Sequence, residues 1–497
     1  MSDERQLLAS DPERSVFVSA NAGTGKTKVL IERVLRLLLR EEMPDTILCV
    51  TFTNAAAAEI QERLNDRLAK WAVMSGEELM ADVKEMTGRQ PSQEMMARAR
   101  RLFAEVIDND QGPRVETTHS FCQSLLSRFP VEAGVPPQFK LISEGAKDRF
   151  LQEGFASLFS HPDSQVRDAL SDLVALTDSQ SLMKHVRSFV SFRELSDAAI
   201  AQPFGFVPEF DKAMTALSPY KMADMPMRQM AMVDRLSLLP LAELAAARPD
   251  KMAPLIEWLA ADESQKAQTI SSWQDCFLTK DGTIRAKIFL KKQLDAQPDL
   301  EDKAHFVAQA LIAYQTEVSA LMTAHRSRAL YMIGRAVALY YAEAKQRAAM
   351  LDYDDLIIKA DKLLSASEMM AWVRWKLDYG INHMLVDEAQ DTNSAQWALL
   401  SSLADEFFVQ EKEEGRNRTL FSVGDFKQSI YSFQGAEPLI FLQKEKEFEG
   451  QAKEGGHLFS SVSLTRSYRS SKAILDVVND VMTVSYTHLT LPTIYSV

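Results

Sequence analysis

Cysteine is scarce in this sequence of 497 residues, and long apolar runs are absent from it. The three cysteines, Cys49, Cys122 and Cys276, lie far apart and form neither a disulfide framework nor a zinc-binding pattern. No apolar run approaches the roughly 18 residues that are needed to span a bilayer. The polar N-terminus, MSDERQLLASDPERS, contains no apolar signal segment. We therefore expect a cytoplasmic protein that has no membrane partner.

Positive charge is also in deficit, since 56 Lys and Arg residues face 69 Asp and Glu residues and leave a net charge of −13. This balance argues against a protein that coats nucleic acid by bulk electrostatic attraction. It is compatible with a local DNA groove, because stacking and a few phosphate contacts suffice for an enzyme that moves along a strand. The apolar fraction of 46% is normal for a globular protein, and the length corresponds to about three domains.

Strand patterns are nearly missing between about 145 and 345, where helical periodicity dominates. The stretch from Ala304 to Met350 has no proline and one glycine, which predicts one or two long helices. Apolar runs typical of buried parallel strands lie on both sides of this segment. Those runs are 15–19, 46–52, 383–391 and 419–425. We predict an α/β fold in which a large α-helical insertion interrupts a parallel sheet.

A phosphate loop follows the first of these strands at residues 20–27, ANAGTGKT, and an apolar helical pattern begins directly after it. Ala20 replaces the first glycine of the general pattern. Lys26 is expected to pair with the β- and γ-phosphates of ATP, and the Thr27 hydroxyl to ligate Mg²⁺. A glycine-rich turn that carries Lys-Thr by chance is the alternative. The residues expected to contact ATP are Ala20, Asn21, Ala22, Gly23, Thr24, Gly25, Lys26 and Thr27.

Two adjacent acids follow the apolar run at 383–386. A magnesium nucleotide site needs a carboxylate at the end of a neighbouring strand, and we expect Asp387 to hold Mg²⁺ through water. Glu388 is expected to polarise the attacking water. Taken alone, the two acids fit equally well an ordinary helix N-terminus, where negative charge is favourable. Combined with the phosphate loop, they predict an ATPase.

Further motifs surround these two sites. In chain order they are TFTNAAAAEIQERL (51–64), TTHSFC (117–122), VDEAQDTNSAQW (386–397), VGDFKQSIYSFQGAEP (423–438) and LTRSYRSSKAIL (464–475). With the phosphate loop they make six motifs that resemble, in the same order, those of UvrD/Rep-type superfamily 1 DNA helicases. The resemblance covers the chain except for the helical insertion and the C-terminal tail. It implies that the sheet is RecA-like and that ATP hydrolysis drives 3′-to-5′ movement on single-stranded DNA.

The resemblance also implies roles for individual residues near the nucleotide. Gln6, twenty residues before Lys26, lies where this family places its adenine-reading glutamine. Gln428 would sense the γ-phosphate, and Arg469 would reach it from a second motor domain as an arginine finger. Tyr468 would stack on adenine. With Lys26, Asp387 and Glu388, the residues Gln428 and Arg469 complete the expected catalytic set.

The resemblance places a further group of residues along the path of the DNA strand. Aromatic faces stack on bases without reading sequence, at about 1–3 kcal/mol per base. Core packing is the alternative for each aromatic residue. The expected DNA contacts are Phe52, Thr53, Asn54, His119, Tyr431 and Phe433.

Within the family, three segments resemble the RecB/AddA branch. EAGVPPQF (132–139) follows the TTHSFC motif, DYDDLI (352–357) follows the helical insertion, and GDFKQSIYSFQGAEP (424–438) fits AddA best. An AddA-like protein implies a double-strand-break repair complex with an AddB-like nuclease partner, which works on single-stranded and duplex-end DNA at the nucleoid. A UvrD-like repair helicase without a nuclease shares every catalytic motif and stays the alternative.

The sequence departs from the family pattern at several points. Ala55 stands where the family usually has lysine, and Phe433-Gln434 stand where many relatives have Trp-Arg. Both changes weaken the case for DNA contact and leave the ATP chemistry untouched. Motifs V and VI and a nuclease domain, which the resemblance predicts after the last motif, are not found in the 497 residues.

We expect the following division of the chain. A RecA-like motor domain is built from 1–144 and 346–458, and a helical domain, 145–345, is inserted into it. A second motor domain begins at 459–483. The last fourteen residues, VSYTHLTLPTIYSV (484–497), resemble a translated sequencing adapter more than a natural β-rich tail.

Two other classes of function compete with a helicase. A phosphate-loop switch ATPase would not touch DNA, and TTHSFC and SIYSFQG argue against it. A non-catalytic DNA scaffold would not need both an intact GKT and an intact DEAQD.

Overall fold

The computed structural model describes residues 4–21, 23–108, 112–161, 163–202, 205–365, 380–409, 417–425, 428–429, 438–466 and 468. The chain forms two compact units. Unit 1 is Met1–Leu141 with Ala349–Val497, and unit 2 is Ile142–Ala348. The expected insertion, 145–345, lies inside unit 2. Two short parallel strands in unit 1, β4 (Lys140–Leu141) and β5 (Met350–Leu351), pair where the chain leaves and re-enters this unit.

Unit 1 is built on a six-stranded sheet in the order β3-β2-β6-β7-β1-β8, and every neighbouring pair is parallel. Parallel pairing brings all the carboxyl ends of the strands to one edge, where α/β proteins place their ligands. The strands are β1 (Ser15–Ala20), β2 (Ile47–Thr51), β3 (Arg114–Thr117), β6 (His383–Val386), β7 (Thr419–Gly424) and β8 (Phe459–Leu464).

Helices cover both faces of this sheet, because side chains alternate across each strand. In β1, Phe17 points to one hydrophobic cluster while Val16 and Val18 point to the other. The helices of unit 1 are α1 (Glu4–Ala9), α2 (Lys26–Leu39), η1 (Pro44–Thr46), α3 (Asn54–Val73), α4 (Gly76–Thr87), α5 (Gln93–Asp108), α6 (Thr118–Arg128), α18 (Tyr353–Ser365), η6 (Ala389–Asp391), α20 (Ser394–Val409) and α21 (Pro438–Glu454).

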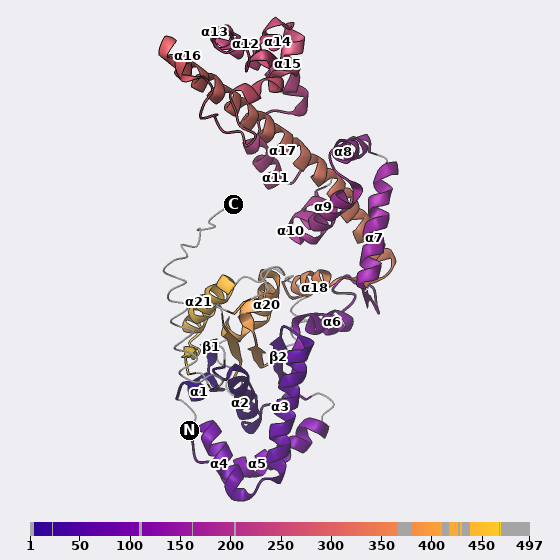
Figure 1. The fold of residues 1–497 in the computed structure, drawn as a ribbon. Coiled ribbons are helices and arrows are strands. Elements are labelled where there is room, and N and C mark those ends of the chain that lie inside the picture. The colour runs from indigo at the N-terminus through magenta and orange to yellow at the C-terminus, as the bar shows by residue number, and fades with distance from the viewer. Residues whose placement is uncertain are drawn as a thin grey trace. The chain divides into compact units, whose positions relative to one another are not determined.

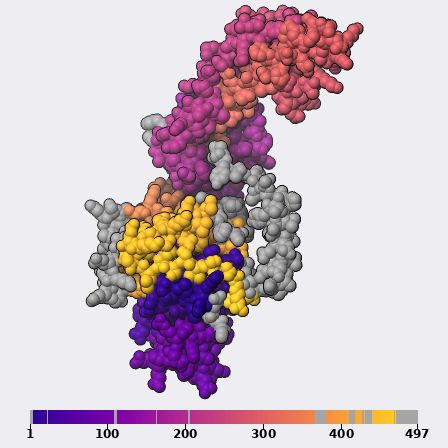
Figure 2. Space-filling model, turned by 90° about the vertical axis from the view of Figure 1, so that its left-hand side faces the viewer, coloured from indigo at the N-terminus to yellow at the C-terminus, as the bar shows by residue number. Residues whose placement is uncertain are grey.

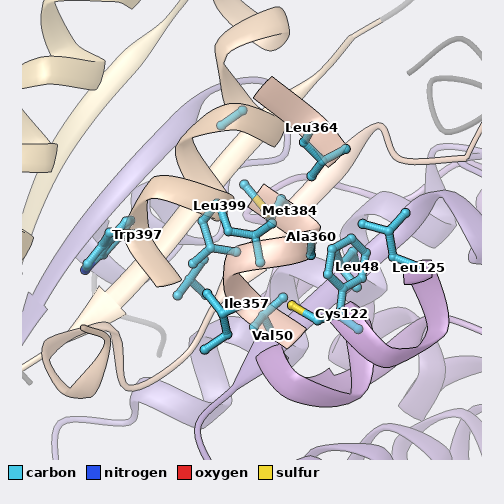
Figure 3. Close-up of a cluster of buried hydrophobic side chains, with 14 of the residues drawn as sticks. Leu48, Val50, Cys122, Leu125, Ile357, Ala360, Leu364, Met384, Trp397 and Leu399 are labelled. Atoms are coloured by element: carbon cyan, nitrogen blue, oxygen red, sulfur yellow. The ribbon is translucent and has the colours of Figure 1, made fainter. Parts of the chain in front are cut away.

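The cluster around Phe17 is filled by α6, α18, α20 and α21. Figure 3 shows part of it, with Leu48 and Met384 of the sheet facing Ile357 of α18 and Leu399 of α20. The opposite cluster is filled by α2, α3, α4 and α5. The predicted α/β sheet with a helical insertion is therefore confirmed, and the sheet is buried on both faces, as its apolar runs indicated.

The last described strand corrects one expected boundary. We expected a second domain to begin at Phe459, but β8 pairs in parallel with β1 from Ser15↔Phe459 to Ala20↔Leu464. This ladder satisfies the backbone groups along the otherwise open side of β1, so residues 459–464 belong to the first sheet. Figure 2 shows this C-terminal part, in yellow, beside the indigo N-terminal residues. The residues 469–497, including the adapter-like tail, lie outside the described part of the chain.

Unit 2 is helical throughout its described residues, apart from one isolated bridge between Leu278 and Ile284. Its axis is α17, a single helix of 48 residues over Leu300–Arg347, as the proline-free stretch predicted. The other helices pack along α17 in two groups, α7–α10 toward one end and α12–α16 toward the other (Figure 1). No helix in the described ranges is long and apolar enough to cross a membrane.

The helices of unit 2 before α17 are α7 (Glu144–Ser157), η2 (Leu158–Ser160), α8 (Ser164–Val174), α9 (Ser179–Ser191), α10 (Arg193–Ala201), α11 (Pro208–Leu217), η3 (Met222–Asp224), α12 (Met225–Ser237), α13 (Leu241–Ala247), α14 (Ala253–Ala260), α15 (Glu263–Gln268), η4 (Ile270–Ser272), η5 (Gln274–Cys276) and α16 (Lys291–Ala296).

Candidate nucleotide site

The loop after β1 has the backbone shape that an anion site needs. Gly23 and Gly25 have φ angles of 73° and 90°, in the left-handed region that favours glycine. The Thr24 amide and hydroxyl both donate to the carbonyl of Asn21, at 3.3 and 2.8 Å. Helix α2 begins at Lys26 with Gly25 as its N-cap and no capping side chain. Its first N–H groups are therefore available to an anion. Ala20 ends β1 and is buried, and Ala22 lies outside the described residues.

Two residues expected at the adenine ring hold this loop from outside. Gln6 is 2% exposed, and its amide nitrogen donates to the Thr24 carbonyl at 3.3 Å while its oxygen accepts from Lys28 Nζ at 3.2 Å. The backbone amide of Tyr468 donates to the carbonyl of Gly23 at 2.7 Å. Its ring is half-exposed, and the guanidinium of Arg466 lies 5.3 Å from the ring centre. Both residues are thus brought to the loop from opposite ends of the chain.

Asp387 is buried at the carboxyl end of β6, and its backbone amide donates to the Val50 carbonyl at 2.8 Å. Burial raises the pKa of this carboxyl to about 6; the nearby Glu388 raises it further, while Lys26 opposes the shift. The Oδ1 atom is buried and has no hydrogen-bond partner in the described part of the protein. Such an orphaned acceptor is costly unless a bound cation or water satisfies it.

The strand order corrects a second expectation. We expected Asp387 to end a strand next to the phosphate-loop strand, but β7 lies between β6 and β1. The acid that ends the neighbouring strand is Asp425, directly after β7, and its side chain is 3% exposed. The carboxylate of Asp387 thus faces the phosphate loop from two strands away.

Glu388 closes the distance between these two segments. Its Oε2 lies 2.7 Å from Lys26 Nζ, although 362 positions separate the residues in the chain. The backbone of Glu388 is left-handed, with φ 48° and ψ 44°. For a residue other than glycine this conformation costs about 1 kcal/mol or more, and such strain is concentrated at functional sites. The lysine side chain is 12% exposed and the glutamate 37% exposed, so the pair is only partly screened by solvent.

Gln390 also belongs to this site, and sequence reasoning missed it. Its amide nitrogen donates to Glu388 Oε2 at 2.8 Å, and its oxygen accepts the backbone N–H of Asp425 at 2.8 Å. A Cβ on Gly424 would lie 2.9 Å from that oxygen, so glycine is needed at the end of β7. The amide of Gln428 in turn donates to the Asp425 carbonyl at 2.9 Å. The position of Gln390, two residues after Glu388, was the signal available.

The expected DNA-contacting residues follow β2 and β3, the two strands beside β6 at this end of the sheet. Phe52 is half-buried, and Thr53 uses its hydroxyl to cap α3, accepting from the Ala56 amide at 3.1 Å. Asn54, the first residue of α3, is exposed. His119 is half-buried, its pKa is lowered by burial, and it lies edge-on to Tyr353 at 5.1 Å.

Tyr431, Phe433 and Arg469 lie outside the described residues, so no structural statement tests their expected roles.

The residues fit a magnesium ion that is held mainly by phosphates and water. Thr27 lies in the first turn of α2, and Asp387 supplies the unpartnered oxygen. In the described ranges no three His, Cys, Asp or Glu side chains form a ready-made metal cluster. Mg²⁺ bound with nucleotides uses one or two protein oxygens and keeps several waters, so no such cluster is required.

A parallel sheet with a glycine loop before a helix N-terminus, and with acids at the same edge, is the fold of P-loop nucleotide-binding proteins. Comparison of the chain with known families narrows this class. The model of the UvrD/REP helicase N-terminal domain matches residues 1–449, and the chain belongs to this family.

Curated relatives include proteins named as the AddA component of an ATP-dependent helicase/nuclease. Those of Exiguobacterium sibiricum and Geobacillus kaustophilus are each 26% identical over 96% of this chain and 39% of their own length. The protein from Bacillus licheniformis is 27% identical over 94% of this chain and 38% of its length. The chain thus spans well under half the length of the curated relatives that it matches.

Proposed function

We propose that this chain is the ATP-binding part of an ATP-dependent DNA helicase or translocase with 3′-to-5′ polarity. The observation that carries the proposal is the 2.7 Å contact between Lys26 and Glu388 beside the buried Asp387. These residues lie at the sheet edge to which the loops after β2 and β3 also lead. One edge therefore carries both the candidate nucleotide groups and the candidate DNA groups.

In this proposal the chain's own residues act in sequence around ATP. Lys26 leaves Glu388 and donates to the β- and γ-phosphates, while the open N–H groups of the loop hold the phosphate oxygens. Thr27 and Asp387 hold Mg²⁺, which supplies neutralisation of the phosphate charge. Glu388, released from Lys26, orients the attacking water and accepts its proton. Gln428 senses the γ-phosphate, and Gln6 and Tyr468 hold the adenine.

Arg469 is assigned the role of arginine finger, completing the charge stabilisation around the γ-phosphate.

We assign the single-strand path to Phe52, Thr53, Asn54 and His119 in the described residues, and to Tyr431 and Phe433 outside them. The relatives' name, which states both a helicase and a nuclease, supports a place in a repair helicase–nuclease that acts on DNA ends. An AddB-like nuclease is the proposed partner, and the nucleoid of the cytoplasm is the proposed location.

The test is ATP hydrolysis with and without single-stranded DNA, measured together with nucleotide binding by calorimetry. We expect DNA to stimulate hydrolysis. Lys26→Ala should abolish Mg-ATP binding, because Lys26 is the described loop's cation facing Glu388. The matched control is Lys70→Ala, an exposed lysine in the last turn of α3. Unchanged ATP affinity in Lys26→Ala would show that the phosphate loop is misassigned, and hydrolysis indifferent to DNA would favour a switch ATPase.

A further inference from the structure

A second cavity lies in unit 2, outside the nucleotide site. It has a volume of about 560 Å³, within the range of about 300–1,000 Å³ that is usual for ligand cavities. Its walls come from the end of α13, the segment 284–290, α16 and the first turns of α17. The described residues of unit 2 alone form it.

Cations surround this cavity although the chain is acidic overall. Arg248, Arg285, Lys287 and Lys291 line it, and Glu301 is the one acid among its lining residues. None of Arg285, Lys287 and Lys291 forms an ion pair with a described carboxylate. Arg248 is 4.0 Å from Asp250. A local excess of positive charge in a chain of net charge −13 marks a surface that attracts an anionic partner.

The floor of the cavity is apolar. Ile284, Ile288 and Leu294 line it together with Leu290, whose side chain is 57% exposed and therefore open to a ligand. His305, from α17, is the remaining titratable lining group. An apolar floor with a cationic mouth suits a ligand that carries both a bulky apolar group and carboxylates.

Hydrogen bonds hold the walls in place. The Arg248 guanidinium donates to the Ile288 carbonyl, and Gln293 donates to the Ala247 carbonyl at 2.6 Å. Arg285 Nε donates to the Asp275 carbonyl at 2.7 Å, and its backbone amide to the Phe277 carbonyl at 2.9 Å. The cavity is therefore a built feature of the helical unit, formed where α13, α16 and α17 meet.

We propose that this cavity docks an acidic peptide segment of a partner protein, with a Leu-, Ile- or Phe-like side chain inserted into the floor and carboxylates at the cationic mouth. Charge complementarity selects an acidic partner, and the apolar floor selects a peptide over a nucleic-acid backbone, which has no apolar side chain to insert. The proposal does not rest on the nucleotide site or on DNA binding.

The experiment uses fluorescein-labelled dodecapeptides and the full 497-residue protein, with binding followed by fluorescence anisotropy. One set of peptides carries three to four Asp or Glu residues beside Leu or Phe. A second set keeps the acids and replaces the apolar residues by Ser, and a third keeps the apolar residues and replaces the acids. We expect only the first set to bind, with affinity that weakens as salt is added.

Two variants locate the site. The double variant Lys287→Glu/Lys291→Glu should weaken binding at least tenfold, and Leu290→Ser should weaken it several-fold. The matched control is Lys184→Glu/Lys212→Glu, two exposed lysines on α9 and α11 of the same unit, which should leave binding unchanged. Thermal melting checks that each variant is folded.

Three outcomes would overturn the proposal. Absence of binding by the whole first set refutes it, and equal binding of the Ser-substituted set refutes the apolar insertion. Single-stranded or duplex 20-mers that bind with the same sensitivity to Lys287→Glu/Lys291→Glu and displace the peptide would assign the cavity to nucleic acid instead.

Discussion

Lys26 and Glu388 each occupy the position that the other must leave when nucleotide binds. Their contact at 2.7 Å satisfies the lysine and holds the glutamate carboxylate where it cannot also orient a water freely. Phosphate oxygens are stronger competitors for the lysine, because they carry more negative charge and the loop amides support them. ATP binding therefore both fills the loop and releases the base, which links substrate recognition to activation.

Glu388→Gln tests that assignment at the level of one atom pair. The amide keeps an oxygen acceptor for Lys26 and Gln390 but cannot take a proton from water. We expect ATP to bind with nearly unchanged affinity and hydrolysis to fall by about 10²–10⁴-fold, the usual contribution of a general base. Calorimetry and steady-state hydrolysis on the same preparation decide it, and turnover close to that of the parent protein would exclude Glu388 as the base.

Asp387 gives the site a pH dependence whose sign follows from its burial. Its pKa is raised to about 6, so the carboxylate that must hold Mg²⁺ is ionised above that pH and protonated below it. We expect Mg-ATP affinity to fall as the pH drops through 6, by roughly tenfold per unit at the limit. In Asp387→Asn, affinity should be low at every pH and should keep only the slope due to the nucleotide itself. Parallel slopes for the two proteins would contradict the prediction.

Among the elements, the site depends on a strand order that residues far apart in the chain create. Four strands were predicted from their β-branched apolar runs, and the phosphate loop and the acids from their motifs. Strand β3, with sequence RVET, is half-buried for most of its length, so it carries no apolar run to find. Strand β8 reads as an edge strand, and only its ladder with β1 assigns it to the first sheet.

The part played by Gln390 was unpredictable for the same reason. Its hydrogen bonds to Glu388 and to the Asp425 amide exist because β6 and β7 are neighbours, and no local pattern encodes that pairing. Propensity and motif spacing specify an element and the residues at its end. The order of the elements arises from packing across the whole sheet, where β6 and β7 are placed between β2 and β1.

Gln390→Ala should uncouple the ends of β6 and β7. It removes the amide that orients Glu388 and leaves the Asp425 N–H without its acceptor, each worth about 1–3 kcal/mol when buried. We expect kcat to fall by about ten- to hundredfold with KM for ATP changed little, because the phosphate loop is untouched. Gln396→Ala is the control, since this equally buried glutamine only caps α20 through the Asn393 amide. Equal losses in both variants would indicate general destabilisation of the loop instead.

Taken as one molecule, the described chain has one nucleotide-binding sheet and one helical unit. In the family that it belongs to, the resemblance implies that ATP lies between two RecA-like domains whose closing and reopening separate the strands. The chain spans 38–39% of the relatives that it matches. Its loop, Lys26, Thr27, Asp387 and Glu388 lie on the one sheet, so they need no second domain to assemble.

We therefore expect the 497-residue chain to bind Mg-ATP, to hydrolyse it weakly and not to separate DNA strands. Binding relies on groups that the first sheet holds, whereas rapid turnover relies on arginines from a second domain, worth about 10³–10⁵ in related phosphoryl transfers. Strand separation further needs two domains that move against each other. A strand-displacement assay on a duplex with a 3′ single-stranded tail tests this, with calorimetric ATP binding on the same sample to show that the site is folded and Lys26→Ala as the background. ATP-dependent unwinding well above that background would mean that this one sheet and the helical unit suffice as a motor.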